Sequence, residues 1–308
     1  MNPLRQQLRE YVSLRRGLGH KFIKPAKSLE GFVTFMEHCD ATFITTKVAL
    51  EWATQSPGKH ASWAINLANV RGFSRHLQTI DVRTEVPPVG LLSYSGSAKP
   101  YIYSDMEIQA LLEAALALKP VDALRRWTYH CLFGLLPVTG LRISEALALK
   151  RKDVDLEGCI LTVRDTKFGK SRYVPIHAST QRVLTEYARR REEHVNPPCS
   201  DYFLVAERGG RLLPQYVYPV FLRLSRQIGL RKPTACSGPR IHDFRHRFAV
   251  MTLLQWYRSG ENVDNLLPKL STYLGHTCVR DTYRYLSACP ELMEFAARRL
   301  ETRWEATP

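Results

Sequence analysis

The sequence predicts a mainly helical protein with a small β-sheet, in which an N-terminal helical bundle precedes a larger α+β domain. Apolar residues recur at helical spacing through most of the 308-residue chain. Only residues 158–164 and 171–176 have the alternating or β-branched pattern of strands. Proline and glycine interrupt the pattern in residues 85–100, and a chain of this length suits two domains. We therefore expect a first domain at 1–84, a linker at 85–100 and a second domain at 101–308.

Four amphipathic stretches predict the helices of the first domain. Leu4 and Leu8 fall on one face of the first stretch, and Leu29, Phe32 and Met36 fall on one face of the second. The third stretch opens with threonines that can cap a helix. The predicted helices span residues 3–16, 25–38, 45–54 and 59–78.

The second domain is predicted to begin with a capped helix. Ser104 and Glu107 have the spacing of a capping box, which starts a helix that continues through Leu118. Further helices are expected at 122–136 and 142–150, and a polar turn at 166–170 joins the two strands into a hairpin. From Thr180 onward the pattern is mainly helical.

The last predicted helix covers residues 290–304. It begins with Pro290 and carries an apolar stripe that includes Leu292 and Phe295. This stripe could dock on a neighbouring protomer or pack on its own domain, and the sequence leaves both alternatives open.

Composition favours an anionic partner and an intracellular protein. The formal net charge is +15, and a basic excess of this kind attracts phosphate backbones. The seven cysteines are odd in number and form no C-x-x-C pair, so we expect reduced thiols rather than a disulfide framework or a zinc ribbon. The N-terminus lacks the apolar core of a signal peptide, and no apolar run is long enough to span a membrane.

Five short motifs in the second domain carry side chains suited to binding or attacking an anion. Arg142 begins a predicted helix, where the helix N-terminus also favours anions. His242 and Arg245 are three residues apart, so a helix places them on one face. Taken singly, each motif is more typical of a basic surface or of a packed aromatic residue. The motifs are Thr139-Gly140-Leu141-Arg142-Ile143-Ser144-Glu145, the turn with Lys167 and Lys170, His242-Asp243-Phe244-Arg245-His246, Leu274-Gly275-His276 and Tyr283-Arg284-Tyr285.

Two other interpretations of these residues are weaker. A phosphate-binding loop at Gly169 would need another glycine five residues earlier, and that position is Arg164. A zinc site built from Cys236, His242 and His246 would lack a fourth ligand.

In this order and spacing, the five motifs resemble the tyrosine recombinase family, also called phage-type integrases. The resemblance extends from about Tyr101 to Tyr285, and it leaves two ambiguities. Lys170 competes with Lys167 for the position of the hairpin lysine, and Tyr283 lies beside the expected nucleophile. The catalytic residues that the resemblance implies are Arg142, Lys167, His242, Arg245, His276 and the nucleophile Tyr285.

The resemblance also implies a mechanism without metal, ATP or another cofactor. Arg142 and Arg245 would bind the scissile phosphate while Tyr285 forms a 3′-phosphotyrosyl link. His242 would take the phenolic proton. His276 would orient the phosphate, and Lys167 would protonate the leaving 5′-oxygen.

The partners that the resemblance implies are double-stranded DNA and further copies of the chain, with four protomers on two DNA sites. Accessory DNA-binding proteins are also compatible with this activity, no membrane is expected, and the protein would act in the cytoplasm at the nucleoid. The expected process is site-specific recombination of a mobile element or plasmid. The alternatives are relaxation of DNA in the manner of a type IB topoisomerase, and sequence-specific DNA binding without catalysis.

Overall fold

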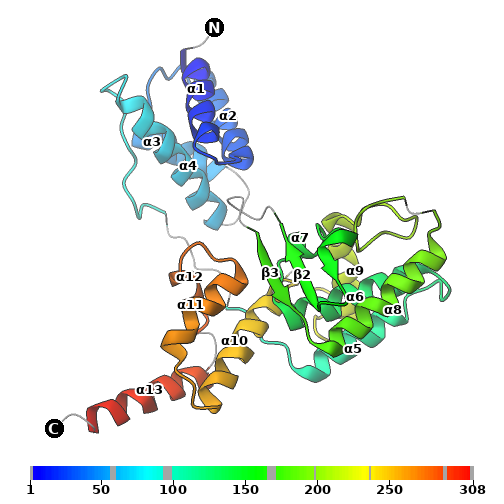
Figure 1. Ribbon diagram of the computed structural model, residues 1–308. Helices are drawn as coiled ribbons and strands as arrows, with labels where there is room; N and C mark the ends of the chain where they lie inside the picture. The colour runs from blue at the N-terminus through cyan, green and yellow to red at the C-terminus, as the bar shows by residue number, and fades with distance from the viewer. Residues whose placement is uncertain are drawn as a thin grey trace. The chain divides into compact units, whose positions relative to one another are not determined.

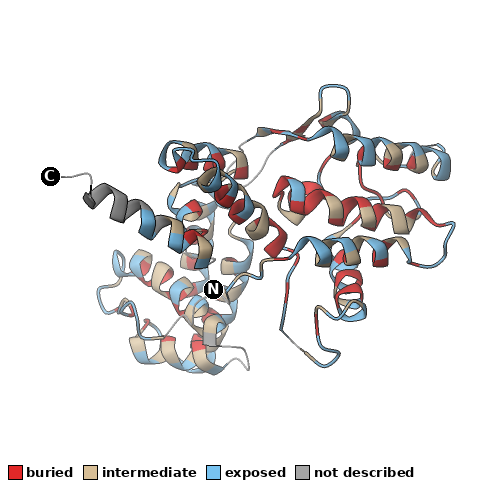
Figure 2. Cartoon of the chain, turned by 90° about the horizontal axis from the view of Figure 1, so that it is seen from below, coloured by how far each residue is buried: buried red, intermediate tan, exposed pale blue. Residues whose placement is uncertain are grey.

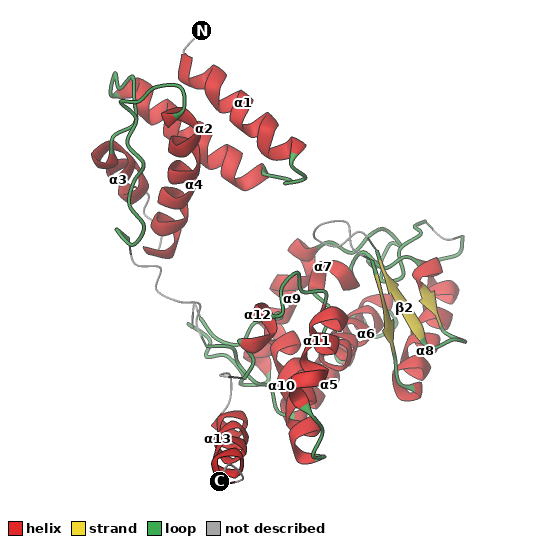
Figure 3. Ribbon diagram, turned by 60° about the vertical axis from the view of Figure 1, so that its left-hand side comes forward, coloured by secondary structure: helices red, strands yellow, loops and turns green. Residues whose placement is uncertain are grey.

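The protein consists of two units, Met1–Ala98 and Lys99–Pro308, in the computed structural model (Figure 1). The structure describes residues 3–55, 60–92, 99–164, 171–197, 199–235, 237–286 and 290–305. Helices dominate both units, and the strands of the second unit form one small sheet (Figure 3). The predicted fold class, mainly α with a small sheet, is confirmed.

The first unit is a bundle of four helices. They are α1 (Pro3–Gly17), α2 (Ile23–His38), α3 (Thr46–Gln55) and α4 (His60–Gln78). Helix α4 packs against the other three. Leu29, Phe32 and Met36 of α2 are buried in the core, on the face that the apolar spacing predicts.

The segment that follows α4 is held on the first unit. The Glu85 carboxylate accepts a hydrogen bond from the backbone N–H of Thr46 at 2.7 Å. Arg71 donates to the carbonyl oxygens of Pro87 and Pro88, each at 2.7 Å. The start of the predicted linker at 85–100 is therefore anchored by backbone and side-chain hydrogen bonds.

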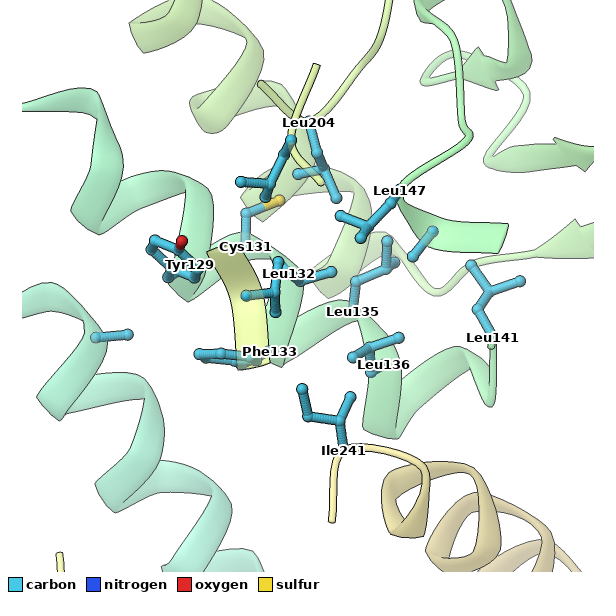
Figure 4. Packing of buried hydrophobic residues seen from close by; sticks show 14 of the residues in the cluster. Tyr129, Cys131, Leu132, Phe133, Leu135, Leu136, Leu141, Leu147, Leu204 and Ile241 are labelled. Atoms are coloured by element: carbon cyan, nitrogen blue, oxygen red, sulfur yellow. The ribbon is translucent and has the colours of Figure 1, made fainter. Parts of the chain in front are cut away.

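The second unit is built around α6 (Leu124–Thr139). Buried side chains such as Leu132, Phe133, Leu135 and Leu136 cover several sides of this helix, which is typical of a central helix (Figure 4). The surrounding helices are α5 (Asp105–Leu116), α8 (Ala178–His194), α9 (Pro214–Gln227) and α10 (Asp243–Arg258). Figure 2 shows that buried residues gather where the elements of each unit face one another. The capping box of Ser104 and Glu107 is confirmed at the start of α5.

The sheet is antiparallel, with the strand order β1-β2-β3. Strands β2 (Ile160–Val163) and β3 (Arg172–Pro175) confirm the predicted hairpin, and Leu161 opposite Val174 packs into the core. Strand β1 (Val154–Asp155) was not predicted, because two residues carry no readable alternation. The turn with Lys167 and Lys170 falls in residues 165–170, outside the described residues.

The helix predicted at residues 142–150 is much shorter than expected. Helix α7 spans only Ile143–Ala146, and the 3₁₀ helix η1 (Arg151–Asp153) follows. The chain leaves the helix because its backbone pairs elsewhere: the Leu149 carbonyl accepts the Phe203 N–H at 2.8 Å, and Lys150 forms a bridge with Tyr202. Tertiary pairing thus overrides the helical preference of the sequence.

Three further helices and α10 form the last part of the second unit. They are α11 (Val263–Leu274), α12 (Arg280–Tyr283) and α13 (Pro290–Glu305). Leu292 of α13 is fully buried, and Phe295 stacks on Tyr257 of α10 at 5.6 Å. The beginning of the C-terminal helix therefore packs on its own domain. No helix within the described ranges is long and apolar enough to span a membrane.

Replacing Gly140 with alanine should lower the free energy of unfolding by roughly 2 to 5 kcal/mol. Gly140 has a φ of 61°, a left-handed conformation that costs other residues about 1–2 kcal/mol. A Cβ there would lie 2.6 Å from the Phe248 ring, which stacks on Tyr273, and such overpacking costs about 1–3 kcal/mol more. Gly229→Ala is the control, because Gly229 has a φ of 76° and open space around it. Chemical denaturation showing equal losses for both variants would contradict the packing argument.

Candidate active site

Two helices end at glycines whose carbonyl groups hold arginine side chains. Helix α6 ends at Gly140 and α11 ends at Gly275, both in the left-handed conformation. Arg245 donates from Nη1 to the Gly140 carbonyl at 2.8 Å, and Arg142 donates from Nη2 to the Gly275 carbonyl at 3.3 Å. Helix C-termini carry partial negative charge, which stabilises cations there. The two helix ends therefore attract guanidinium groups from separate parts of the chain.

Arg142 and Arg245 converge on the same carbonyl group. Both guanidiniums donate to the Leu274 oxygen, that of Arg142 at 3.5 Å. Arg142 lies at the N-cap of α7, where its side chain is 30% exposed, whereas Arg245 on α10 is only 1% exposed. Burial and the adjacent charge of Arg142 lower the pKa of Arg245 to about 10, so it remains protonated at neutral pH. Two cations side by side form a ready site for an oxyanion.

The buried carboxylate of Glu145 holds the arginines in place. Arg142 donates to it at 2.7 Å, and Arg172 of β3 binds both of its oxygens at 2.8 and 3.2 Å. Arg172 also donates to the Tyr273 carbonyl at 2.6 Å. Burial alone would raise the pKa of Glu145, but its hydrogen bonds and the charges of Arg172 and Arg142 lower it to about 2.

The sequence analysis did not assign Glu145 or Arg172 to the site. The available signal for Glu145 was its position three residues after Arg142, where a helical turn brings two side chains together. Arg172 had no comparable signal, because its partners come from α7 and α11 and are distant in the sequence.

Tyr285 lies at the centre of a group of aromatic side chains. Its ring is 5.9 Å from the His276 ring, stacked at 22°, and 5.4 Å from the His246 ring. The His242 ring lies 5.0 Å from the His246 ring. The Tyr285 phenol also lies close enough to the Arg245 guanidinium to raise the pKa of Arg245. A candidate nucleophile thus contacts the imidazoles of His276 and His246, and the His242 ring lies behind His246.

The two neighbouring tyrosines have opposite environments. Tyr285 is 4% exposed, whereas Tyr283 is 54% exposed. Helix α12 ends at Tyr283, so Tyr285 lies in the turn that follows rather than on the helix itself. Only Tyr285 points into the cluster, which is the tyrosine that the family spacing selects.

The histidines of the cluster are neutral at physiological pH. Burial, followed by the charges of neighbouring groups, lowers the pKa of His242 and of His276 to about 4. For His242 the neighbours are His246 and Arg245, and for His276 they are Arg245 and Arg142. A neutral imidazole can accept a proton on one nitrogen and donate a hydrogen bond from the other.

The structure brings most of the predicted site residues into one cluster. Arg142, His242, Arg245, His276 and Tyr285 lie together, although they are spread over more than 140 residues of the chain. Lys167 lies outside the described residues. Among the residues that are described, no group of three or more His, Cys, Asp or Glu could hold a metal ion. The cluster combines two guanidinium groups, neutral imidazoles and a phenol, which are groups that can bind an anion, accept a proton and attack phosphorus.

Comparisons with known proteins identify relatives of the whole chain. The phage integrase family matches residues 103–291. The putative integrase/recombinase y4rB of Sinorhizobium fredii is 48% identical over 99% of each chain. The tyrosine recombinase XerC of Myxococcus xanthus is 29% identical over 76% of this chain and 74% of its own.

The fold is also similar to those of solved recombinase structures. The Tn1549 transposon integrase in complex with transposon right end DNA has a TM-score of 0.70 and 16% identity, covering 96% of this chain and 98% of its own. The lambda integrase tetramer bound to a Holliday junction has a TM-score of 0.63 and 18% identity, covering 92% of this chain and 76% of its own.

Replacing Glu145 with glutamine should remove stability that depends on pH. The pKa of Glu145 is lowered from 4.5 to about 2, so its ionised form stabilises the protein above pH 4.5. This contribution, on the order of 3 kcal/mol, is lost as the pH falls from 4.5 toward 2. Chemical denaturation across this pH range should show a difference in the free energy of unfolding between wild type and Glu145→Gln, and this difference should shrink as the pH falls.

Glu186→Gln is the matched control for this measurement. The pKa of Glu186 is also lowered to about 2, by hydrogen bonds and charges from Arg189 and Arg190, but Glu186 is exposed to solvent. Solvent screens such a pair, so its loss should matter much less. Equal losses of stability in both variants would show that burial of the ion pairs of Glu145 makes no additional contribution to the free energy of unfolding.

Proposed function

The chain belongs to the phage integrase family of tyrosine recombinases, and from this we propose that it breaks and rejoins DNA at specific sites through Tyr285. The observation that carries the proposal is the cluster in which Arg142 and Arg245 share the Leu274 carbonyl while His276, the next residue but one, stacks on the Tyr285 ring. Chemistry on a phosphodiester needs an anion site and a nucleophile in contact, and this cluster supplies both.

We propose that Arg142 and Arg245 bind the non-bridging oxygens of the scissile phosphate. Arg142 is partly exposed and can meet an arriving phosphate, whereas Arg245 is buried and already donates to the Gly140 and Leu274 carbonyls. Fixed guanidiniums offset the charge that develops in the transition state. In this proposal the same two arginines bind the scissile phosphate and activate it for attack.

In the proposed reaction, one phosphorus–oxygen bond replaces another, and a neutral histidine accepts the proton that the phenol loses. The Tyr285 oxygen attacks phosphorus and forms a phosphotyrosyl bond while the bond to the 5′-oxygen breaks. His242 accepts the phenolic proton, which its low pKa leaves it free to do at neutral pH. Lys167 protonates the leaving 5′-oxygen, as the family resemblance implies. Attack by a 5′-hydroxyl of another strand reverses these steps and rejoins the DNA.

We further propose the assembly in which this reaction occurs. Residues 1–84 form a core-binding domain that holds double-stranded DNA together with the catalytic domain at 101–308, and four protomers unite two sites. The net charge of +15 supports extensive contact with phosphates. The substrate would be a mobile element or plasmid, with or without accessory DNA-binding proteins, which places the protein at the nucleoid.

Tyr285→Phe should abolish covalent attachment to DNA. A nicked suicide substrate traps the phosphotyrosyl protein, because the short cleaved strand diffuses away and cannot be rejoined. Wild-type protein should give this adduct, and so should Tyr283→Phe, because Tyr283 points to solvent. Gel electrophoresis under denaturing conditions reports the adduct. If Tyr285→Phe retains it, or if wild-type protein never forms it on a cognate site, the assignment is wrong.

Arg142→Ala and Arg245→Ala should each slow cleavage by roughly 100-fold to 1000-fold, because each removes stabilisation of the transition state. DNA affinity should change by less than roughly tenfold, since many other phosphate contacts remain. Single-turnover cleavage and equilibrium binding measure the two effects separately. Arg189→Ala, on the exposed face of α8, is the control and should change neither. Equal losses of cleavage and binding would contradict the catalytic assignment.

A further inference from the structure

One buried hydroxyl group links the candidate nucleophile segment to His276. The Thr282 side chain lies 2.8 Å from His276, with Oγ1 next to Nδ1. Thr282 is completely buried and belongs to α12, three residues before Tyr285. The same short segment therefore carries the nucleophile and the partner of a site histidine.

The environment of this hydroxyl determines which atom donates the hydrogen bond. A neutral imidazole carries one N–H, so Nδ1 is either a donor or an acceptor toward Thr282. Within the described part of the chain, the Thr282 hydroxyl has no other hydrogen-bond partner. If Nδ1 donated, the hydroxyl proton would be buried without an acceptor, which is unfavourable. If the hydroxyl donates to Nδ1, both atoms are satisfied.

We propose that Thr282 is a positioning residue that fixes His276 in the tautomer protonated at Nε2. In this tautomer His276 offers an N–H to the scissile phosphate and cannot serve as the base for Tyr285. The inference rests on the proposed function for the part that concerns DNA. It assigns His276 a donor role and leaves proton acceptance to His242.

The position of Thr282 also couples two parts of the site. His276 follows α11, whereas Thr282 and Tyr285 belong to α12 and its following turn. The His276 ring stacks on Tyr285 and is bonded to Thr282, so both contacts form only when α12 is docked. Docking of the segment that carries Tyr285 thus also orients His276, the proposed hydrogen-bond donor to the phosphate. An orienting partner of this kind typically contributes 10-fold to 100-fold to activity.

The first experiment measures the tautomer directly in the full-length protein without DNA. Ring-nitrogen chemical shifts of labelled histidines distinguish the two neutral forms, and His276→Ala identifies the His276 signals by their disappearance. Wild-type protein and Thr282→Ser should show Nε2–H, since serine keeps the hydroxyl. Thr282→Val has the same shape without a donor and should lose this preference. Nδ1–H in wild type, or an unchanged tautomer in Thr282→Val, would overturn the proposal.

The second experiment measures single-turnover cleavage of the suicide substrate. Thr282→Val should slow cleavage by roughly 10-fold to 100-fold, and Thr282→Ser should recover most of that loss. In a His276→Ala background, Thr282→Val should change the rate by no more than about twofold, because the partner of the hydroxyl is already absent. Losses that multiply in the double variant would mean that Thr282 acts only through packing.

Thr128→Val is the matched control for loss of a buried threonine hydroxyl. Thr128 is also buried, and its hydroxyl donates to the Leu124 carbonyl near the start of α6. It lies twelve residues before Gly140, which along a helix is roughly 18 Å from the site. This variant should keep both the tautomer and the cleavage rate per folded molecule. If wild-type protein cleaves no DNA, the proposed function fails, whereas the tautomer measurement still decides the role of Thr282.

Discussion

The site depends on one electrostatic constraint, which is that several guanidinium groups must be held together where solvent is largely excluded. Glu145 is the carboxylate that pairs with both Arg142 and Arg172, and the carbonyls at the ends of α6 and α11 accept further hydrogen bonds. Without these acceptors, repulsion and desolvation would drive the cations apart. The lowered pKa values of Glu145 and Arg245 are two consequences of this single arrangement.

The same constraint explains why distant elements fold around this point. Arg142 follows α6, Arg172 begins β3, and Arg245 lies on α10, yet all three donate to carbonyls of residues 273–275. Arg172 begins β3 and donates to the Tyr273 carbonyl, so it ties the hairpin strand to the end of α11. The arginines that we propose to bind the phosphate therefore also stabilise the domain.

Tyr285, the proposed nucleophile, joins this network through a short segment rather than a long helix. Helix α12 has only four residues; within it Thr282 contacts His276, and in the turn that follows, Tyr285 contacts the imidazoles of His276 and His246. A short helix has little stability of its own and is held by tertiary contacts. The position of Tyr285 thus depends on its contacts with His276 and His246, as the positions of Arg142 and Arg172 depend on Glu145.

The sequence by itself determined the fold class, the hairpin, the capped start of α5 and the order of the chemical motifs, because each depends on residues close together in the chain. It also distinguished Tyr285 from Tyr283 through spacing to His276. Only the tertiary structure showed that Glu145, Arg172 and Thr282 contact the candidate site, and only it shortened the helix expected at 142–150. Those features arise from contacts between elements that are distant in sequence, where burial and unpaired polar groups outweigh local preference.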